Sequence, residues 1–212
     1  MSRLYEFFTQ GWSPPADPKT SFKGKIVIAT GSNTGLGFEA TVKFVAHDAF
    51  LVILAVRDLK KGDQTKSLIE ERTSKKDRVE VWRLDMNSYG SIQGFAKRAS
   101  TLDHLDIAVL NAGVFMATYE ESKYGWEQTV QINALSTALL GLLLLPKLKA
   151  SKTKNNFPVL EIVASGNYQR IVISDNNAKQ RIYSDCIIRP RTTRHLWHML
   201  PLNYLPCMSC DH

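Results

Sequence analysis

Short apolar runs recur along residues 25–164 of this 212-residue chain, separated by segments of helical length. The runs are rich in β-branched residues, which are typical of buried strands. The expected strands are 25–30, 51–56, 79–84, 106–110 and 159–164, and the expected helices are 38–47, 61–75, 88–101 and 126–148. Strands that alternate with helices predict a parallel sheet with helices on both faces. We therefore expect an α/β fold with a Rossmann-like, doubly wound sheet in three layers.

Two elements of this pattern and the segments on either side of it have features of their own. The run 79–84 alternates apolar and polar residues, which indicates a strand near a sheet edge. Pro146 lies near the end of the helix 126–148, where it predicts a kink or a stop. The proline-containing segment 1–24 is expected to be an irregular arm before a domain spanning 25–174, and 175–212 an irregular tail.

Charge and cysteine content restrict the classes of partner. The formal charge is +7, but the basic residues are scattered, so a solvated surface is favoured over a nucleic-acid site. The three cysteines all lie at or after Cys186, which suits a reducing compartment, and we expect a cytoplasmic protein. The longest apolar stretch, 138–145, is far below the roughly 20 residues of a membrane span, so no membrane partner is expected.

A glycine-rich segment lies where the first expected strand meets the first helix. The segment is Thr30-Gly31-Ser32-Asn33-Thr34-Gly35-Leu36-Gly37. Gly31 permits the tight turn, Gly35 lets a pyrophosphate approach the backbone, and Gly37 allows close packing of helix on strand. The helix N-terminus offers free N–H groups to the phosphates. In this context the segment predicts a dinucleotide-binding loop.

The end of the second expected strand distinguishes NADP(H) from NAD(H). NAD sites usually have an acidic residue there, which binds the ribose hydroxyls. This chain has Arg57 at the strand tip, and Asp58 one place later is expected to turn away. Arg57, with Lys61 close behind, favours a 2′-phosphate and thus NADP(H), with NAD(H) the less favoured cofactor. The alternative is that Arg57 is an ordinary surface charge.

Further motifs carry a resemblance to one family. Asp85 and Met86 follow the third strand, Asn111-Ala112-Gly113 follows the fourth, and Asn133 lies in the long helix. With the glycine-rich loop, their order and spacing resemble the short-chain dehydrogenase/reductase family, close to its fungal, retinol-dehydrogenase-like members. The resemblance covers about residues 20–173.

The resemblance implies roles for these residues. It implies that Asp85, beside Met86, caps the adenine ring, that Asn111, Ala112 and Gly113 line the nicotinamide ribose, and that Asn133 supports a proton relay. It also implies that Ser165, after the fifth strand, polarises a substrate carbonyl. The implied reaction is hydride transfer between NADP(H) and a small-molecule carbonyl or alcohol, and a homo-oligomer is left open.

The chain departs from the family after Ser165. The family has a Tyr-x-x-x-Lys pair there, in which the lysine lowers the tyrosine pKa for proton transfer. None of the three later tyrosines has a lysine four residues on, and the pair Tyr119/Lys123 lies too early in the chain to match. The resemblance ends after Ile173, so the fold is expected to be incomplete on its C-terminal side. A truncated or misread gene product is the favoured explanation, and a natural, diverged tail is the alternative.

Two hypotheses of function therefore stay open. The first is an NADP(H)-dependent oxidoreductase, and the second is a catalytically inactive protein that keeps cofactor or partner binding.

The pairs His195-x-x-His198 and Cys207-x-x-Cys210 have the residue types of a zinc site. No framing strand or helix surrounds them, so we interpret them as chance clustering and expect no metal.

Overall fold

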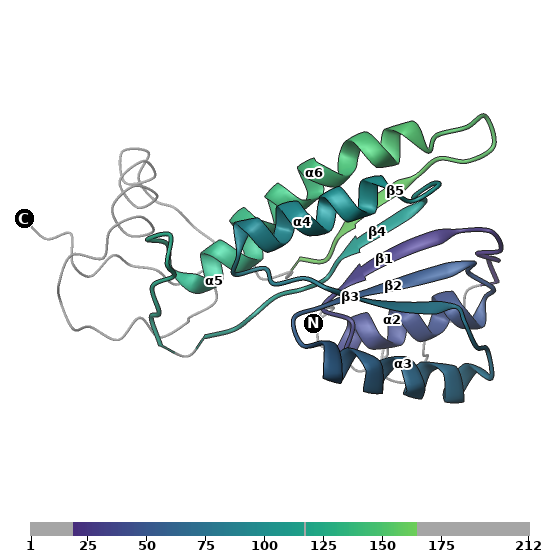
Figure 1. Cartoon of the computed structure of the whole chain (residues 1–212), viewed down its shortest axis with the longest axis horizontal. Coiled ribbons are helices and arrows are strands. Elements are labelled where there is room, and N and C mark those ends of the chain that lie inside the picture. The colour runs from purple at the N-terminus through teal and green to yellow at the C-terminus, as the bar shows by residue number, and fades with distance from the viewer. Residues whose placement is uncertain (1–18, 117, 165–212) are drawn as a thin grey trace, which may run out of the picture.

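Five parallel strands form the centre of the protein (Figure 1), and a computed structural model describes residues 19–116 and 118–164. The strands are β1 (Ile26–Thr30), β2 (Leu51–Val56), β3 (Val79–Arg83), β4 (Ile107–Leu110) and β5 (Val159–Ile162). Their order across the sheet is β3-β2-β1-β4-β5, with every neighbouring pair parallel. This is the doubly wound order that the sequence predicts, and among the described strands β3 lies at the edge, as expected.

Helices cover both faces of the sheet. Figure 1 shows α2 (Gly35–Ala46) and α3 (Leu59–Thr73) on one face, and α4 (Tyr89–Ser100) and α6 (Thr137–Ala150) on the other. Right-handed crossovers require this, because the chain moves outward from β1 to β3 and then returns across the sheet to β4. The apolar core is divided accordingly into two clusters, one under α4 and α6 and one under α2 and α3.

The expected helix 126–148 differs most from the structure. It consists of α5 (Gln128–Val130), a π-helical segment η1 (Gln131–Ser136) and α6. The sequence did not reveal the π-helix, a rare element that occurs frequently at functional sites. Pro146 does not stop α6, which continues to Ala150. Pro146 has no N–H, so the carbonyl of Leu142 lacks its helical hydrogen bond. Both residues are exposed, so water can solvate that carbonyl.

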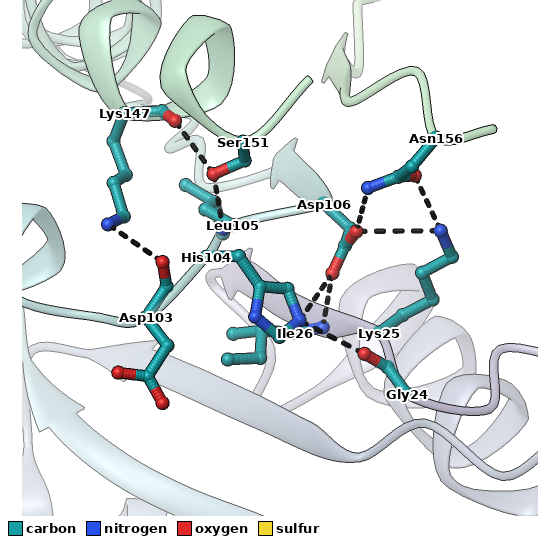
Figure 2. A network of polar contacts seen from close by, with 10 residues as sticks. All are labelled: Gly24, Lys25, Ile26, Asp103, His104, Leu105, Asp106, Lys147, Ser151 and Asn156. Atoms are coloured by element: carbon teal, nitrogen blue, oxygen red, sulfur yellow. Dashed lines mark hydrogen bonds and ion pairs between the residues drawn. The ribbon is translucent and has the colours of Figure 1, made fainter. Parts of the chain in front are cut away.

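A buried carboxylate joins three strands at the end of the sheet opposite the glycine-rich loop. Asp106, 3% exposed, precedes β4 and accepts a hydrogen bond from the backbone N–H of Ile26, 2.8 Å away. Figure 2 shows Lys25, His104 and Asn156 around the same carboxylate. The N–H of Val159, at the start of β5, donates to the Asp106 carbonyl. Asp106 therefore aligns the amino ends of β1, β4 and β5.

The segment directly before β1 contacts the rest of the fold. Residues 19–24 form no helix or strand, and Phe22 packs edge-on against Phe44, with ring centroids 4.8 Å apart. The Phe22 N–H also donates to the carbonyl of His47, the residue after α2. These contacts attach the described end of the segment to α2, and residues 1–18 lie outside the described residues.

The β5 side of the molecule exposes apolar side chains. Within the described residues β5 is the last strand on its side, and Val159, Ile162 and Val163 are 47%, 49% and 43% exposed. One helical run in the described part, Gln128–Ala150, is long and apolar enough to cross a membrane. That evidence is weak, because core helices meet the same criterion and the inner leucines of α6 pack against the sheet.

Candidate cofactor-binding site

The glycine-rich loop lies at the carboxyl end of β1, as the sequence predicts. Thr34, Gly35 and Leu36 are exposed there, and Leu36 is 76% exposed. Thr34 is the N-cap of α2, but its side chain forms no capping hydrogen bond. The first turn of α2 therefore has no side-chain acceptor at its N-cap and leaves its amides for a ligand.

The three glycines have different surroundings. Gly31 has φ +62°, and a Cβ there would lie 2.7 Å from the Cα of Ala112. Gly35 has φ +59° and open space where a Cβ would be. At Gly37 a Cβ would lie 2.6 Å from the Asn111 amide nitrogen and 2.7 Å from the Gly31 carbonyl oxygen. Gly37 thus packs α2 against the loops beyond β1 and β4, rather than against a strand face as we expected.

Ser32 and Asn33 of the glycine-rich loop form hydrogen bonds to other parts of the protein. Ser32 is buried, and its hydroxyl donates to the Ala29 carbonyl at 2.9 Å. The Asn33 carbonyl faces the Thr65 hydroxyl of α3 at 3.5 Å. The Ser32 hydroxyl thus fixes the turn, and a ligand contact from Ser32 would have to come from its backbone.

Thr30 joins the glycine-rich loop to the loop after β4. Its hydroxyl oxygen accepts from the N–H groups of Asn111 and Ala112, at 3.0 and 2.9 Å. The Asn111 side-chain amide donates back to the carbonyls of Thr30 and Gly31, at 3.2 and 3.3 Å. The two predicted cofactor loops therefore form one rigid unit. The sequence placed Thr30 at the start of the glycine-rich segment but indicated no role for its hydroxyl.

Asn133 fixes the next part of the same loop. Its side-chain oxygen accepts from the Val114 N–H and its amide donates to the Val114 carbonyl, both at 2.8 Å. Its side chain also lies against Gly113, where a Cβ would be 3.3 Å from the Asn133 oxygen. Asn133 is exposed on η1, so the π-helical turn carries this amide to the open side of the loop.

The adenine-side loop follows β3. The Asp85 carboxylate accepts from the Asn87 N–H at 2.9 Å, and the Asp85 N–H donates to the Ser91 hydroxyl at 2.9 Å. Met86 is only 7% exposed and belongs to the core under α4 and α6. The side chain of Met86 therefore stabilises the loop from below, and only its backbone could face a cofactor.

A cluster of positive charge lies between β2 and α3. Arg57, Lys60 and Lys61 are all exposed there. Asp58 is the N-cap of α3, and its carboxylate accepts from the N–H groups of Lys60 and Lys61 at 2.9 and 3.3 Å. The only acidic group at this junction is thus used as a helix cap, in agreement with the expectation that it turns away.

The Tyr119/Lys123 pair does not have the geometry of a proton-transfer pair. The two residues lie in a loop before α5, not on one helical turn, and the Lys123 ammonium lies over the Tyr124 ring, 5.0 Å from its centroid. Burial, then Glu121 and Glu127, raises the pKa of Tyr119. A proton-transfer tyrosine needs the opposite shift, which supports the rejection of this pair.

Some predicted residues lie outside the described part of the chain. Ser165 follows its last described residue, Ala164, and the His195/His198 and Cys207/Cys210 pairs also lie in the undescribed segment. Within residues 19–116 and 118–164 there is no group of three or more His, Cys, Asp or Glu side chains that could hold a metal ion.

Comparison with known proteins identifies the family. The short chain dehydrogenase family model matches residues 25–156, which include the glycine-rich loop, Asp85, Asn111 and Asn133. This chain belongs to the short-chain dehydrogenase family. The family consists of oxidoreductases. The loops described above lie at the carboxyl end of the sheet, where folds of this kind bind their ligands.

The similar short-chain dehydrogenases are fungal and bacterial. Short-chain dehydrogenase/reductase ffsI of Aspergillus flavipes is 43% identical over 175 residues, covering 81% of this chain and 52% of the relative. Short-chain dehydrogenase/reductase phmF of Phaeosphaeria nodorum is 46% identical, covering 72% and 46%. A putative short chain dehydrogenase from Escherichia coli CFT073, complexed with NADPH, is 28% identical with a TM-score of 0.60, covering 72% and 63%. This chain thus spans about half the length of the fungal relatives.

Proposed function

We propose that residues 25–164 bind NADP(H) and that the protein derives from an oxidoreductase acting on a small-molecule carbonyl or alcohol. When bound, the nicotinamide supplies hydride transfer. The chain's own residues bind and orient the dinucleotide. The amides of α2 hold the pyrophosphate, Asp85 borders the adenine, and the Asn111–Gly113 backbone faces the nicotinamide ribose. Two sets of contacts support this arrangement, because they hold these loops in place without a ligand. They are the hydrogen bonds of the Thr30 hydroxyl with Asn111 and Ala112, and those of the Asn133 side chain with Val114.

The junction of β2 and α3 carries the preference for NADP(H). An NAD site usually has a carboxylate free to bind the ribose hydroxyls, but Asp58 already accepts two backbone hydrogen bonds as a helix cap. The exposed cations of Arg57, Lys60 and Lys61 are instead suited to a 2′-phosphate. The NADPH complex of the E. coli neighbour adds support at the level of the family.

Arg57→Ala is expected to weaken NADPH binding about ten- to a hundred-fold and to leave NADH binding within about two-fold of wild type. The reason is that a hydrogen bond to a charged group contributes roughly 1.5–3 kcal/mol, and only NADPH has the 2′-phosphate. Fluorescence titration with both nucleotides measures this. Lys97→Ala, which removes an exposed charge on α4, is the control for net charge. Equal affinity of the wild type for both nucleotides would reject the NADP(H) preference.

Substitutions at Gly35 and Gly37 are expected to separate binding from stability. Gly35→Ala has room for its Cβ, so the protein should fold at a cost of about 1–2 kcal/mol for the left-handed backbone, yet lose NADPH binding. Gly37→Ala puts a Cβ against the Gly31 carbonyl and should chiefly lower stability. Thermal melts and NADPH titrations of both variants test this. Normal NADPH binding by folded Gly35→Ala would contradict the phosphate-loop assignment.

A catalytically inactive, cofactor-binding protein is the second candidate. The observation that favours it is the lack of Tyr-x-x-x-Lys after Ser165, together with the unsuitable geometry of Tyr119 and Lys123. Both candidates predict NADPH binding. They differ in turnover, which a purified sample of residues 1–212 can report directly.

A further inference from the structure

The π-helical segment η1 contacts two separate loops of the cofactor site. Asn133 binds Val114 on the nicotinamide side through two hydrogen bonds. Two residues earlier on the same segment, Gln131 donates from its side-chain amide to the Asn87 side-chain oxygen at 3.1 Å. Asn87 belongs to the loop after β3, on the adenine side. A single turn of η1 therefore holds both halves of the candidate site.

We infer that Gln131 is a positioning residue that holds Asp85 in place for the adenine end of the nucleotide. This inference rests on the proposed function, which assigns the adenine to Asp85. The contacts run from the Gln131 amide to the Asn87 side chain, and from the Asn87 N–H to the Asp85 carboxylate. Ser91 holds the Asp85 N–H from the other side. Gln131 acts through Asn87 and has no direct contact with the nucleotide.

The burial of Gln131 argues against a role in packing alone. Its side chain is fully buried, and its Oε1 has no hydrogen-bond partner among the described residues. A buried amide with an unpaired oxygen costs free energy that an apolar side chain of similar size would not. The contact that offsets this cost is the bond to Asn87, so the polar group at this position serves the loop.

A second contact holds the same loop, which limits the expected effect. The Tyr89 N–H donates to the Tyr124 hydroxyl oxygen at 3.1 Å, and the two rings stack with centroids 4.2 Å apart. This contact lies two residues beyond Asn87. Loss of the Gln131 bond is therefore expected to loosen the segment 85–87 and to leave the loop as a whole attached.

Gln131→Met tests the inference, because it keeps the volume and removes the amide. Binding of adenosine 2′,5′-bisphosphate, which carries only the adenine end, should weaken about five- to twenty-fold. Binding of nicotinamide mononucleotide should stay within about two-fold of wild type. Hydrogen exchange at the Asn87 N–H should become faster by a similar factor. Little stability should be lost, since apolar replacement of a poorly paired buried polar group is nearly neutral.

Ser136→Ala is the matched control. Ser136 is also fully buried on η1 with an unpaired hydroxyl, but the structure gives it no contact with the adenine-side loop. It should leave both affinities and Asn87 exchange unchanged. A Gln131→Met protein with wild-type affinity for the bisphosphate and wild-type Asn87 exchange would overturn the inference. A wild type that binds neither probe would reject the proposed function, while Asn87 exchange in Gln131→Met would still decide whether Gln131 holds the loop.

Discussion

Asp106→Ala is expected to lower the free energy of unfolding by about 3 kcal/mol and the melting temperature by roughly 6–12 °C. The carboxylate is 3% exposed, and its removal leaves the buried Ile26 N–H without an acceptor and Lys25 and Asn156 without their shared partner. The side-chain contacts from Asp106 to the start of β1 and to Asn156 would then be lost (Figure 2), while the bond from the Val159 N–H to the Asp106 backbone carbonyl would remain. Thermal and urea unfolding monitored by circular dichroism measure the effect.

His104→Gln and Asp106→Asn are the controls. The His104 side chain is 38% exposed, so the loss of its contact with Asp106 should change stability by at most about 1 kcal/mol. Asp106→Asn keeps an acceptor for the Ile26 N–H and should fall between the other two variants. Nucleotide affinity of folded Asp106→Ala should be unchanged, because Asp106 lies at the opposite end of the sheet from the glycine-rich loop. Melting of Asp106→Ala within one degree of wild type would show that the network does not stabilise the sheet.

Residues 1–212 are expected to turn over carbonyl substrates about 10²–10⁴-fold more slowly than a full-length fungal relative, or not at all. Positioned proton transfer contributes a factor of that size, and no Tyr-x-x-x-Lys follows Ser165 to supply it. The one such pair, Tyr119/Lys123, has a tyrosine whose pKa is raised instead of lowered. NADPH oxidation against a panel of aldehydes, ketones and quinones measures the rate.

A chimera distinguishes a damaged enzyme from a binding protein. Residues 174–212 would be replaced by the C-terminal part of the A. flavipes relative, whose length this chain covers to 52%. Activity in the chimera alone would support a dehydrogenase that has lost its proton donor. Rapid turnover by the native chain, abolished by Ser165→Ala, would contradict the prediction and assign the proton donor to the segment after Ser165.

The architecture could be predicted from the sequence because apolar runs rich in β-branched residues alternate along the chain with segments long enough to form helices. Apart from Lys25 and Thr30, the runs at 25–30 and 51–56 are apolar, and their strands are buried on both faces. Helix ends were less predictable, since they depend on local caps. The carboxylate of Asp58 starts α3 at Leu59, two residues before the expected start.

The candidate site was predictable only where a motif is local. The glycine-rich loop and the cationic β2–α3 junction are each one continuous segment of the sequence, and the structure places both where they were expected. The bonds from Thr30 to Asn111 and from Gln131 to Asn87 join residues 81 and 44 positions apart. Nothing in the spacing of such residues indicates the contact. The π-helix was also missed, because the apolar residues of 126–148 predict one continuous helix and η1 lies inside that range.

Titration of the wild-type chain with NADPH and NADH tests whether residues 25–164 bind a nucleotide. We expect saturable binding of NADPH, at least ten-fold tighter than that of NADH, and loss of NADPH binding in Gly35→Ala while that variant stays folded. Calorimetry with circular dichroism on the same samples supplies both readouts. A folded wild-type protein that binds neither nucleotide at millimolar concentration would contradict the assignment of residues 25–164 as a nucleotide-binding domain.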